Sequence, residues 1–169
     1  TLPGTAGRMG YRFFVEIPIT SDRALLVGSE AHHLLHVMRG AVGDQIVLFD
    51  GSGREYVARV QRLKRAEVEL VITAAKDVSR ESSRQVVAGV ALPKGDRQRW
   101  LVEKLVELGV SQVVPLRTEH SVVHPDQRSV GKLQRFVIEA SKQCGRNLLM
   151  QIGPLTSLQD FLSAAPDAA

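Results

Sequence analysis

The stretch that decides the fold is VVAGVALPKGDRQRWLVEKLVELGVSQVVPLRTEHSV, residues 86–122. It contains an apolar run, a polar corner, a helical pattern and a second apolar run, VVPL. This order predicts a strand, a loop, a helix and a second strand. The loop that holds Pro93, Lys94 and Gly95 follows the carboxyl end of the first strand, where open α/β sheets bind their ligands. We therefore expect a site at this loop.

The helical pattern in this stretch has two different faces. At about 100° per residue, one broad side is apolar and is expected to pack on the sheet; it comprises Leu101, Val102, Leu105, Val106 and Leu108. The other side carries Trp100, Glu103, Lys104 and Glu107. It is either a solvated charged face or part of a site, and Lys104 or an arginine is expected to neutralise the two glutamates. Asp96 is expected to cap the amino end, and Gly109 suits the left-handed position after the helix.

The composition is that of a globular protein with an excess of positive charge. Of the 169 residues, 44% are hydrophobic and 24% are charged, which suffices for the core of one domain or of two small ones. The single cysteine, Cys144, excludes an internal disulfide framework and is expected to be a small buried hydrophobe. No apolar run is long enough to span a bilayer, so we expect a cytoplasmic protein. A net charge of +4 and a pI near 9.6 favour an anionic partner.

The amino-terminal half predicts a β-rich unit over residues 12–74, after a disordered leader at 1–11. RFFVEIPI, from Arg12, is typical of a strand, and Ser29 with Glu30 opens a short helix that Gly40 closes. Two runs rich in Val, Ile, Leu and Tyr flank Asp-Gly-Ser-Gly at 50–53, which predicts a hairpin. A third strand is expected at AEVELVI, residues 66–72.

Residues 75–84 are polar and are predicted to be a linker. Beyond it, over 85–169, strands alternate with helices, which is typical of βα units on a largely parallel sheet. A helix is expected from about 129 to 144, with an apolar side made of Leu133, Phe136, Val137, Ala140 and Cys144. A short strand at 151–152 and a helix at LQDFLSAA are expected to follow.

Two polar constellations could carry function. Glu139, Gln143 and Arg146 have the spacing i, i+4 and i+7, which would place them on one stripe of the helix, at the rim of a pocket. The alternative is a solvent-facing edge on which Arg146 interacts with the helix end. The second constellation is His32, His33, His36 and Arg39, which with Arg12 would form a phosphate-facing edge or simply a mixed helix surface.

Several classes of site are not expected. His32 and His36 lie four apart, but no Asp, Glu or Cys nearby completes a tetrahedral ligand set, so no metal site is predicted. No P-loop, Rossmann glycine fingerprint or nucleophile elbow occurs in the sequence. These absences remove several enzyme classes without identifying another.

Three strings in this order point to one family: PKGDRQRWLVEKLVELGV, then PLRTEHSV, then EASKQCGR. They resemble the RsmE family of ribosomal RNA methyltransferases, and the resemblance extends from Arg12 to the end of the chain. It implies an α/β (α+β overall) fold, with a PUA-like amino-terminal β-barrel domain and the first part of a SPOUT methyltransferase domain. It also implies S-adenosyl-L-methionine as cofactor, and a homodimer. The family continues into a trefoil knot with a GPEGG-type loop that nothing here matches, so the chain is either a fragment or an incomplete relative.

The resemblance implies methylation of N3 of a uridine in small-subunit (16S) ribosomal RNA. Because N3 takes part in Watson–Crick pairing, the base must be unpaired, and N3 must lose its proton before it attacks the methyl group. By residue type, Arg146 or Lys94 could stabilise the resulting negative charge and Glu139 could take the proton.

The expected contacts to cofactor and RNA complete the prediction. The cofactor is expected at Leu92, Pro93, Gly95, Pro115 and Leu116. The RNA is expected at Arg12, His32, His36, Arg39 and Arg117. The 169 residues alone are expected to bind RNA weakly without methylating it. The alternative function is a non-catalytic RNA-binding or ribosome-assembly protein.

Overall fold

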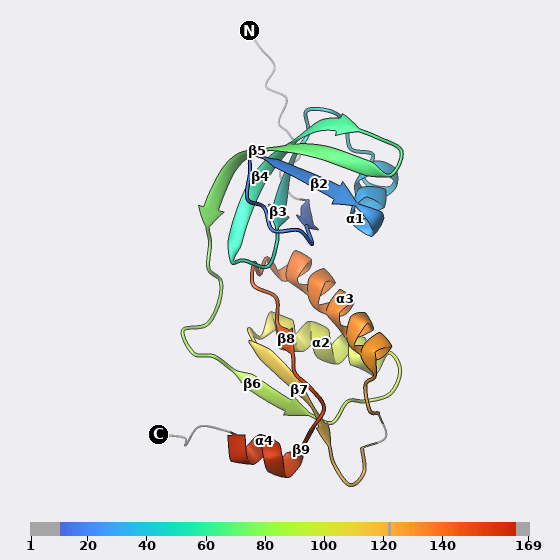
Figure 1. Ribbon diagram of the computed structural model, residues 1–169, viewed down its shortest axis with the longest axis vertical. Helices are drawn as coiled ribbons and strands as arrows, with labels where there is room; N and C mark the ends of the chain where they lie inside the picture. The colour runs from blue at the N-terminus through green and yellow to red at the C-terminus, as the bar shows by residue number, and fades with distance from the viewer. Residues whose placement is uncertain (1–10, 122, 165–169) are drawn as a thin grey trace. The chain divides into compact units, whose positions relative to one another are not determined.

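The computed structural model describes residues 11–121 and 123–164, which divide into two compact units (Figure 1). The first unit extends to Arg80 and also contains Gly145–Leu148. The second contains Glu81–Cys144 and the residues from Leu149 onward. Except for Tyr11, the predicted leader lies outside the described residues.

The first unit is built on a mixed five-stranded sheet with the order β1-β3-β4-β5-β2. Its strands are β1 Arg12–Phe14, β2 Arg23–Val27, β3 Gln45–Phe49, β4 Arg54–Leu63 and β5 Glu67–Asp77. β1 pairs with β3 in parallel and the other neighbours are antiparallel. The predicted hairpin is confirmed as β3 and β4, and its turn contains Gly51 and Gly53 at φ 84° and 92°. Only glycine adopts such angles at little cost.

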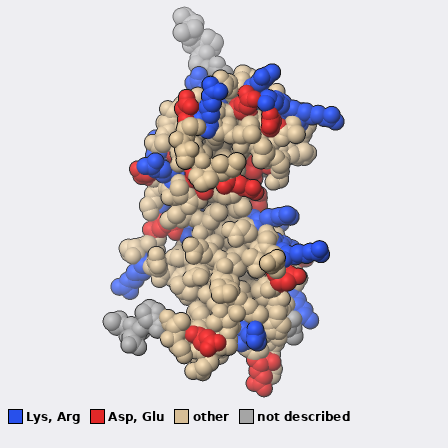
Figure 2. Space-filling view, viewed as in Figure 1, with Lys and Arg blue, Asp and Glu red and all other residues tan. Residues whose placement is uncertain are grey.

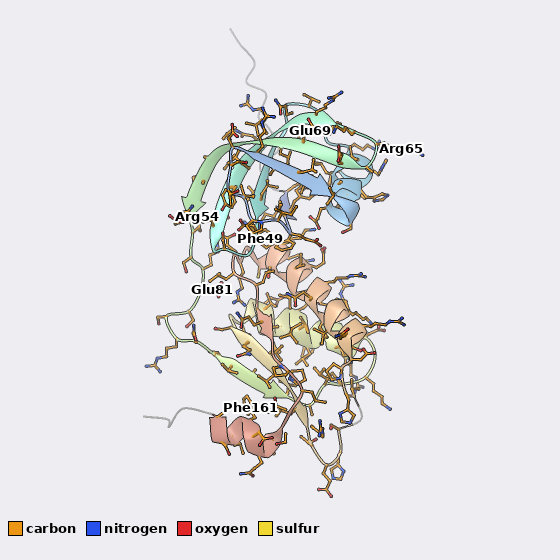
Figure 3. All side chains as sticks on the ribbon, viewed as in Figure 1. Phe49, Arg54, Arg65, Glu69, Glu81 and Phe161 are labelled. Atoms are coloured by element: carbon orange, nitrogen blue, oxygen red, sulfur yellow. The ribbon has the colours of Figure 1, made fainter. Side chains whose placement is uncertain are left out.

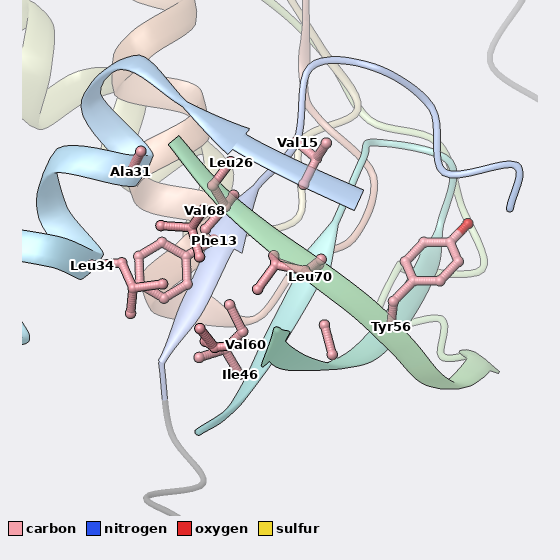
Figure 4. Packing of buried hydrophobic residues seen from close by; sticks show 12 residues of the cluster. Phe13, Val15, Leu26, Ala31, Leu34, Ile46, Tyr56, Val60, Val68 and Leu70 are labelled. Carbon is pink, nitrogen blue, oxygen red and sulfur yellow. The ribbon is translucent and has the colours of Figure 1, made fainter. Parts of the chain in front are cut away.

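The core of the first unit follows from the alternation of side chains along these strands. Successive residues of β4 point to opposite faces, so Tyr56, Ala58 and Val60 are buried while Arg59 is exposed. Phe13 and Leu70 join them in one cluster, which Figure 4 shows from close by. Each such large apolar side chain contributes roughly 1.5 to 3 kcal/mol by leaving water.

The helical segment of the first unit differs from a regular helix. α1, Gly28–His32, continues directly into a π-helical turn, η1, His33–Val37. The predicted closure by Gly40 is not the one observed, because Arg39 is the residue with positive φ, at 52°. Gly40 is needed for another reason: a Cβ there would lie 2.7 Å from Cδ1 of Leu34.

Three strands of the first unit differ from the sequence prediction. β1 has only three residues, since the chain leaves the sheet after Phe14 and Val15 donates a last hydrogen bond to Phe49 O, 3.0 Å away. β2 was not predicted. β5 runs on to Asp77, inside the predicted linker, where Asp77 is in register with Arg54 of β4 and forms an ion pair of 2.8 Å with it.

The second unit has the predicted alternation of strands and helices. β6 Val87–Val90, β7 Gln112–Arg117 and β8 Gln151–Ile152 form a parallel sheet in that order, and β9 Thr156–Ser157 also pairs with β7. α2 Arg97–Glu107 and α3 Gln127–Cys144 pack together on one side of the sheet. α4 Leu158–Ala164 lies on the other side (Figure 1).

Helix α2 largely behaves as predicted. Val102 and Val106 are buried, Trp100 is exposed, and Gly109 has φ 80°. Arg99 and Lys104 neutralise the two glutamates through bonds of 2.7 Å to Glu103 and 2.6 Å to Glu107.

Two details of α2 were predicted wrongly. Leu108 is 77% exposed, because it lies two positions after buried Val106 and hence about 200° around the helix from it. Asp96 makes no side-chain capping bond, because its own backbone is already helical, at φ −67° and ψ −18°.

Candidate functional site

The strongest candidate site lies at the carboxyl edge of the parallel sheet in the second unit. β6 and β7 are in register with Val90 opposite Pro115, so the loop after β6 and the end of β7 lie at the same edge. In that loop Leu92 is buried, whereas Lys94 and Gly95 are exposed. Gly95 has φ 66°, and no heavy atom lies within 4 Å of the position that a Cβ would take. The loop thus offers open backbone and one cation to a ligand.

The predicted cofactor residues are not equally accessible. Pro93 is half-buried, and Pro115 and Leu116 are buried. A Cβ at Gly89 would lie 2.7 Å from the Phe161 ring and 3.0 Å from Leu116. Phe161 of α4, labelled in Figure 3, therefore packs against this face of the sheet together with Leu116.

Of the predicted RNA-binding residues, Arg117 lies at this same edge. It is the last residue of β7, is exposed, and is in register with Ser157 of β9. The chain then turns at once, since Thr118 donates its N–H to Ser121 Oγ at 3.0 Å. Lys94 and Arg117 thus lie at the ends of neighbouring strands.

The predicted catalytic residues come from different parts of the chain: Lys94 from the loop after β6, Glu139 from helix α3, and Arg146 from the segment that clusters with the first unit. Helix α3 begins after β7 at the carboxyl edge and returns to the amino edge, where β8 begins. Glu139 lies twelve positions after Gln127 and thus about 18 Å along the helix. Its carboxylate is exposed and pairs with Lys142 at 3.2 Å. It also lies near enough to Arg99, in the first turn of α2, to help Glu103 raise the pKa of that guanidinium. Among the described residues no hydrogen bond or ion pair joins Glu139 to Lys94.

The predicted stripe of Glu139, Gln143 and Arg146 is wrong for its last member. α3 ends at Cys144, and Gly145 has φ 81°, so the helical rotation stops before Arg146. Arg146 is only 4% exposed and belongs to the segment that clusters with the first unit. The i+7 spacing had assumed a longer helix.

Arg12 is held inside the first unit by several partners. Its guanidinium bonds to Glu55 Oε2 and Asn147 Oδ1, each at 2.6 Å, and to the carbonyl oxygen of Arg146 at 3.3 Å. It also lies 4.9 Å from the ring centre of Phe49, which Figure 3 labels. We name Arg12, Glu55, Arg80 and Asn147 the Arg12 cluster. These contacts already occupy the guanidinium, so the structure gives no support to the predicted RNA contact of Arg12.

The electrostatics of the Arg12 cluster favour an ionised carboxylate. Burial alone would raise the pKa of Glu55, but hydrogen bonds from Arg12 and Arg80 outweigh it and hold the pKa below the ordinary 4.5. Arg80 donates to Glu55 at 3.2 Å and to the carbonyl oxygen of Gly145 at 2.8 Å. Asn147 donates to Val78 O at 2.9 Å. Local spacing gave no signal for this cluster, because Arg12 and Asn147 are 135 positions apart.

The second predicted constellation does form an exposed edge. His32 and His36 are exposed with ring centres 4.7 Å apart, and Arg39 is exposed beside them in the sequence. His33 instead faces Phe13, with ring centres 5.9 Å apart. A π-turn and a non-glycine residue at positive φ both recur at functional sites. In the part of the chain that the structure describes, no group of three potential ligands could hold a metal ion.

The first unit also has a groove that the sequence did not reveal. Its volume is about 380 Å³, and it lies between residues 15–21 and strands β2, β4 and β5. The lining is mainly apolar, including Val15, Ile19 and Leu70, with Arg23 and Glu69 as the charged residues.

Family models match both units of the chain. An RNA methyltransferase domain matches residues 80–169, and an RNA methyltransferase PUA domain matches residues 26–73. Since the first of these covers more than half of the chain, the chain belongs to the RNA methyltransferase family. The predicted fold class, PUA-like followed by a methyltransferase domain, is confirmed.

Within this class, the similar proteins are those of the RsmE type, as the resemblance predicted. The chain is 30% identical to Ribosomal RNA small subunit methyltransferase E of Bacillus subtilis (strain 168), over 84% of this chain and 57% of that protein. It is 31% identical to the protein of the same name from Synechocystis sp., over 88% of this chain and 49% of that protein. The chain thus spans about half the length of the curated relatives it matches.

A solved structure is similar over nearly the whole chain. It is Ribosomal RNA small subunit methyltransferase E from Neisseria gonorrhoeae bound to S-adenosyl methionine, with a TM-score of 0.83 and 27% identity. The match covers 94% of this chain and 67% of that one. Within the residues described here, no helix is long and apolar enough to cross a membrane.

Proposed function

We propose that the protein containing these residues transfers the methyl group of S-adenosylmethionine to N3 of a uridine in small-subunit ribosomal RNA. The observation that carries this proposal is the similarity to an RsmE structure bound to the same cofactor, over both units of the chain. The relatives named for ribosomal RNA support the substrate class. Such a protein acts where ribosomes are assembled, in the cytoplasm.

The residues at the carboxyl edge fit a cofactor that is partly apolar. Gly95 leaves its backbone open to the close approach of a ligand, and Leu92 and Pro93 supply an apolar surface beside it. We assign these residues, with Pro115 and Leu116 behind them, to one side of the pocket. When bound, the cofactor supplies an electrophilic methyl group.

The task of the chain's own residues is to present N3 without its proton. The proton of N3 passes to solvent, which leaves a negative charge on the uracil ring, and a cation at the same edge stabilises that charge. Lys94 is exposed in the loop after β6 and is the residue that we assign to this role. Glu139 and Arg146 were alternatives by residue type. Glu139 pairs with Lys142 and Arg146 is only 4% exposed, so their roles in proton transfer and charge stabilisation have less support.

Replacement of Lys94 tests this assignment. In the full-length protein, Lys94→Ala should lower kcat for methyl transfer to ribosomal RNA by about a hundredfold, since one electrostatic donor is lost. Mass spectrometry of the nucleosides gives both the rate and the methylated atom. Lys76→Ala, which removes an exposed cation of the first unit, is the matched control. Methylation at an atom other than N3 would refute the proposed target atom. Equal rates in the two variants would refute the role of Lys94.

A second candidate function, RNA binding without catalysis, is favoured by the PUA domain match together with the pI near 9.6. We propose that the 169-residue polypeptide, tested by itself, binds RNA weakly with a strong salt dependence and does not methylate it. Calorimetry with S-adenosylmethionine separates the two candidates. Micromolar binding by this polypeptide would show that the carboxyl edge holds the cofactor unaided.

We also propose a homodimer for the full-length protein. Val86, just before β6, and Val87, its first residue, are 44% and 48% exposed, and β6 is an edge strand of its sheet. Light scattering that finds a monomer at working concentrations would contradict this.

A further inference from the structure

Helix α3 carries three cations on one exposed stripe. Arg128, Lys132 and Arg135 have the spacing i, i+4 and i+7, which places them on the same face of the helix. All three are exposed, and among the described residues none of them forms an ion pair with a carboxylate. We name them the α3 stripe. Figure 2 shows Lys and Arg side chains projecting where α3 lies in Figure 1.

The stripe is not explained by the stability of the helix. Like charges three or four positions apart destabilise a helix by a few tenths of a kcal/mol each. Three other helical cations of this unit do form ion pairs with acids: Arg99 with Glu103, Lys104 with Glu107 and Lys142 with Glu139. The first three turns of α3 contain no acidic residue. Asp126, just before the helix, accepts hydrogen bonds from the N–H and the hydroxyl of Ser129, so its carboxylate is already engaged. The charge left over is available to an external anion.

One of the three cations is also held in place. The ammonium of Lys132 lies 5.7 Å from the ring centre of Phe136, within the range of a cation–π interaction. Arg99 of α2 lies 5.9 Å from the same ring, so the positive charge extends across the seam between the two helices. A cation that is already ordered loses less entropy when it binds a ligand.

The stripe begins at the edge where the candidate site lies. α3 follows β7, whose carboxyl end carries Arg117, and its first residue is Gln127. From Arg128 to Arg135 the helix rises about 10 Å, which matches about three phosphates of a stacked strand. A polyanion lying along the stripe would thus lead to the edge that contains Lys94.

We propose that the α3 stripe binds the phosphate backbone of the RNA substrate next to the nucleotide that is methylated. This inference rests on the proposed function for the nature of the polyanion, and it adds a contact surface in the second unit to the PUA domain of the first. Phosphates fit because the stripe has regular spacing and full charge, and because no apolar surface that a protein partner would need lies among its members.

The test is the salt dependence of RNA binding by the full-length protein. The variant Arg128→Gln/Lys132→Gln/Arg135→Gln keeps residues of good helix propensity and removes three charges. For an oligouridylate, the slope of log K against log salt should fall in magnitude by about 2, because each phosphate contact to a single strand contributes about 0.7. Affinity at about 0.1 M salt should fall at least tenfold.

Controls distinguish a site from general charge. Arg59→Gln/Arg65→Gln/Lys76→Gln removes three exposed cations from the first unit and should change the slope by less than half as much. Arg128→Lys/Arg135→Lys keeps the charge and should keep the slope. If circular dichroism shows that the triple variant has not folded, Lys132→Gln alone decides, with an expected change of about 0.7.

The proposal fails if the triple variant and the first-unit control change the slope equally, or if polyglutamate binds the stripe as tightly as the oligouridylate. Its failure is distinct from that of the proposed function. A protein that methylates N3 normally with an intact slope in the triple variant refutes the stripe alone. A protein that shows the expected loss of slope but methylates no uridine refutes the methyltransferase proposal alone.

Discussion

Arg12 and the α3 stripe both carry positive charge, but they differ in whether that charge is already neutralised by partners within the protein. The guanidinium of Arg12 has a carboxylate, an amide oxygen, a backbone carbonyl and an aromatic ring as partners. The three side chains of the stripe have no carboxylate partner among the described residues. The sequence predicts an RNA contact at Arg12 and none at the α3 stripe. The difference shows that a surface for a polyanion is identified by cations that lack an acidic partner, more than by the presence of cations alone.

The largest effect is expected from breaking the Arg12 cluster. Arg12→Met keeps much of the side-chain volume but leaves the partly buried Glu55 with Arg80 alone, so the free energy of unfolding should fall by about 2 to 3 kcal/mol. Urea denaturation measures this. Arg54→Met, which removes an exposed ion pair, is the control. A loss of RNA affinity in Arg12→Met without any loss of stability would reverse the comparison and return Arg12 to the RNA-binding residues.

Acid should weaken the same cluster. The pKa of Glu55 is lower in the folded protein than in the unfolded chain, so its stabilising effect is fully present above the unfolded value of 4.5. It is lost as the pH falls through the lower, folded pKa. The difference in unfolding free energy between wild type and Glu55→Gln should therefore shrink as the pH drops below about 4.5. A difference that is constant from neutral pH to pH 3 or so would mean that Glu55 is not held ionised by Arg12 and Arg80.

A smaller effect of opposite sign is expected at Arg39. A side chain at φ 52° is strained by about 1 kcal/mol, so Arg39→Gly should raise the free energy of unfolding by roughly 0.5 to 1 kcal/mol. If Arg39 contacts RNA, the same change should weaken RNA binding severalfold. Arg39→Asn, which tolerates this backbone and also lacks the charge, should match the loss of affinity. A stabilised variant with unchanged affinity would show that the strain serves no RNA contact.

The smallest effect is expected at Arg54. Its ion pair with Asp77 joins two side chains that are 55% and 81% exposed, so water and salt already screen it. Arg54→Gln should leave the denaturation midpoint in urea unchanged within error. A clear shift would mean that β5 needs this pair in order to extend to Asp77.

Patterns within one element were predicted well from the sequence. The hairpin with Gly51 and Gly53, the helix that ends before Gly109 and the alternation of strands and helices all follow from local spacing. Edge elements were harder, since β2 has a partly exposed sequence that alternates weakly, and β9 has only two residues.

The candidate site was predicted in part. The position of the loop with Lys94 and Gly95 at the carboxyl edge was predicted because the end of a parallel strand is marked in the sequence itself, and its role as a site stays a prediction. The proposed roles of Arg146 and Arg12 depended on tertiary facts that spacing cannot supply. One is where a helix stops, which Gly145 decides. The other is a partner 135 positions away, which only the folded chain brings near.

The first unit is discontinuous along the chain, and this affects the order in which it can fold. Synthesis proceeds from the amino terminus, so the sheet of the first unit is complete well before Asn147 emerges. Until then, Arg12 lacks both its amide partner and the carbonyl oxygen of Arg146. Contacts of such sequence separation form late because their loop must close first. The newly made first unit therefore holds Arg12 through Glu55 and Phe49 alone. It acquires its last contacts only when most of the second unit has already been translated.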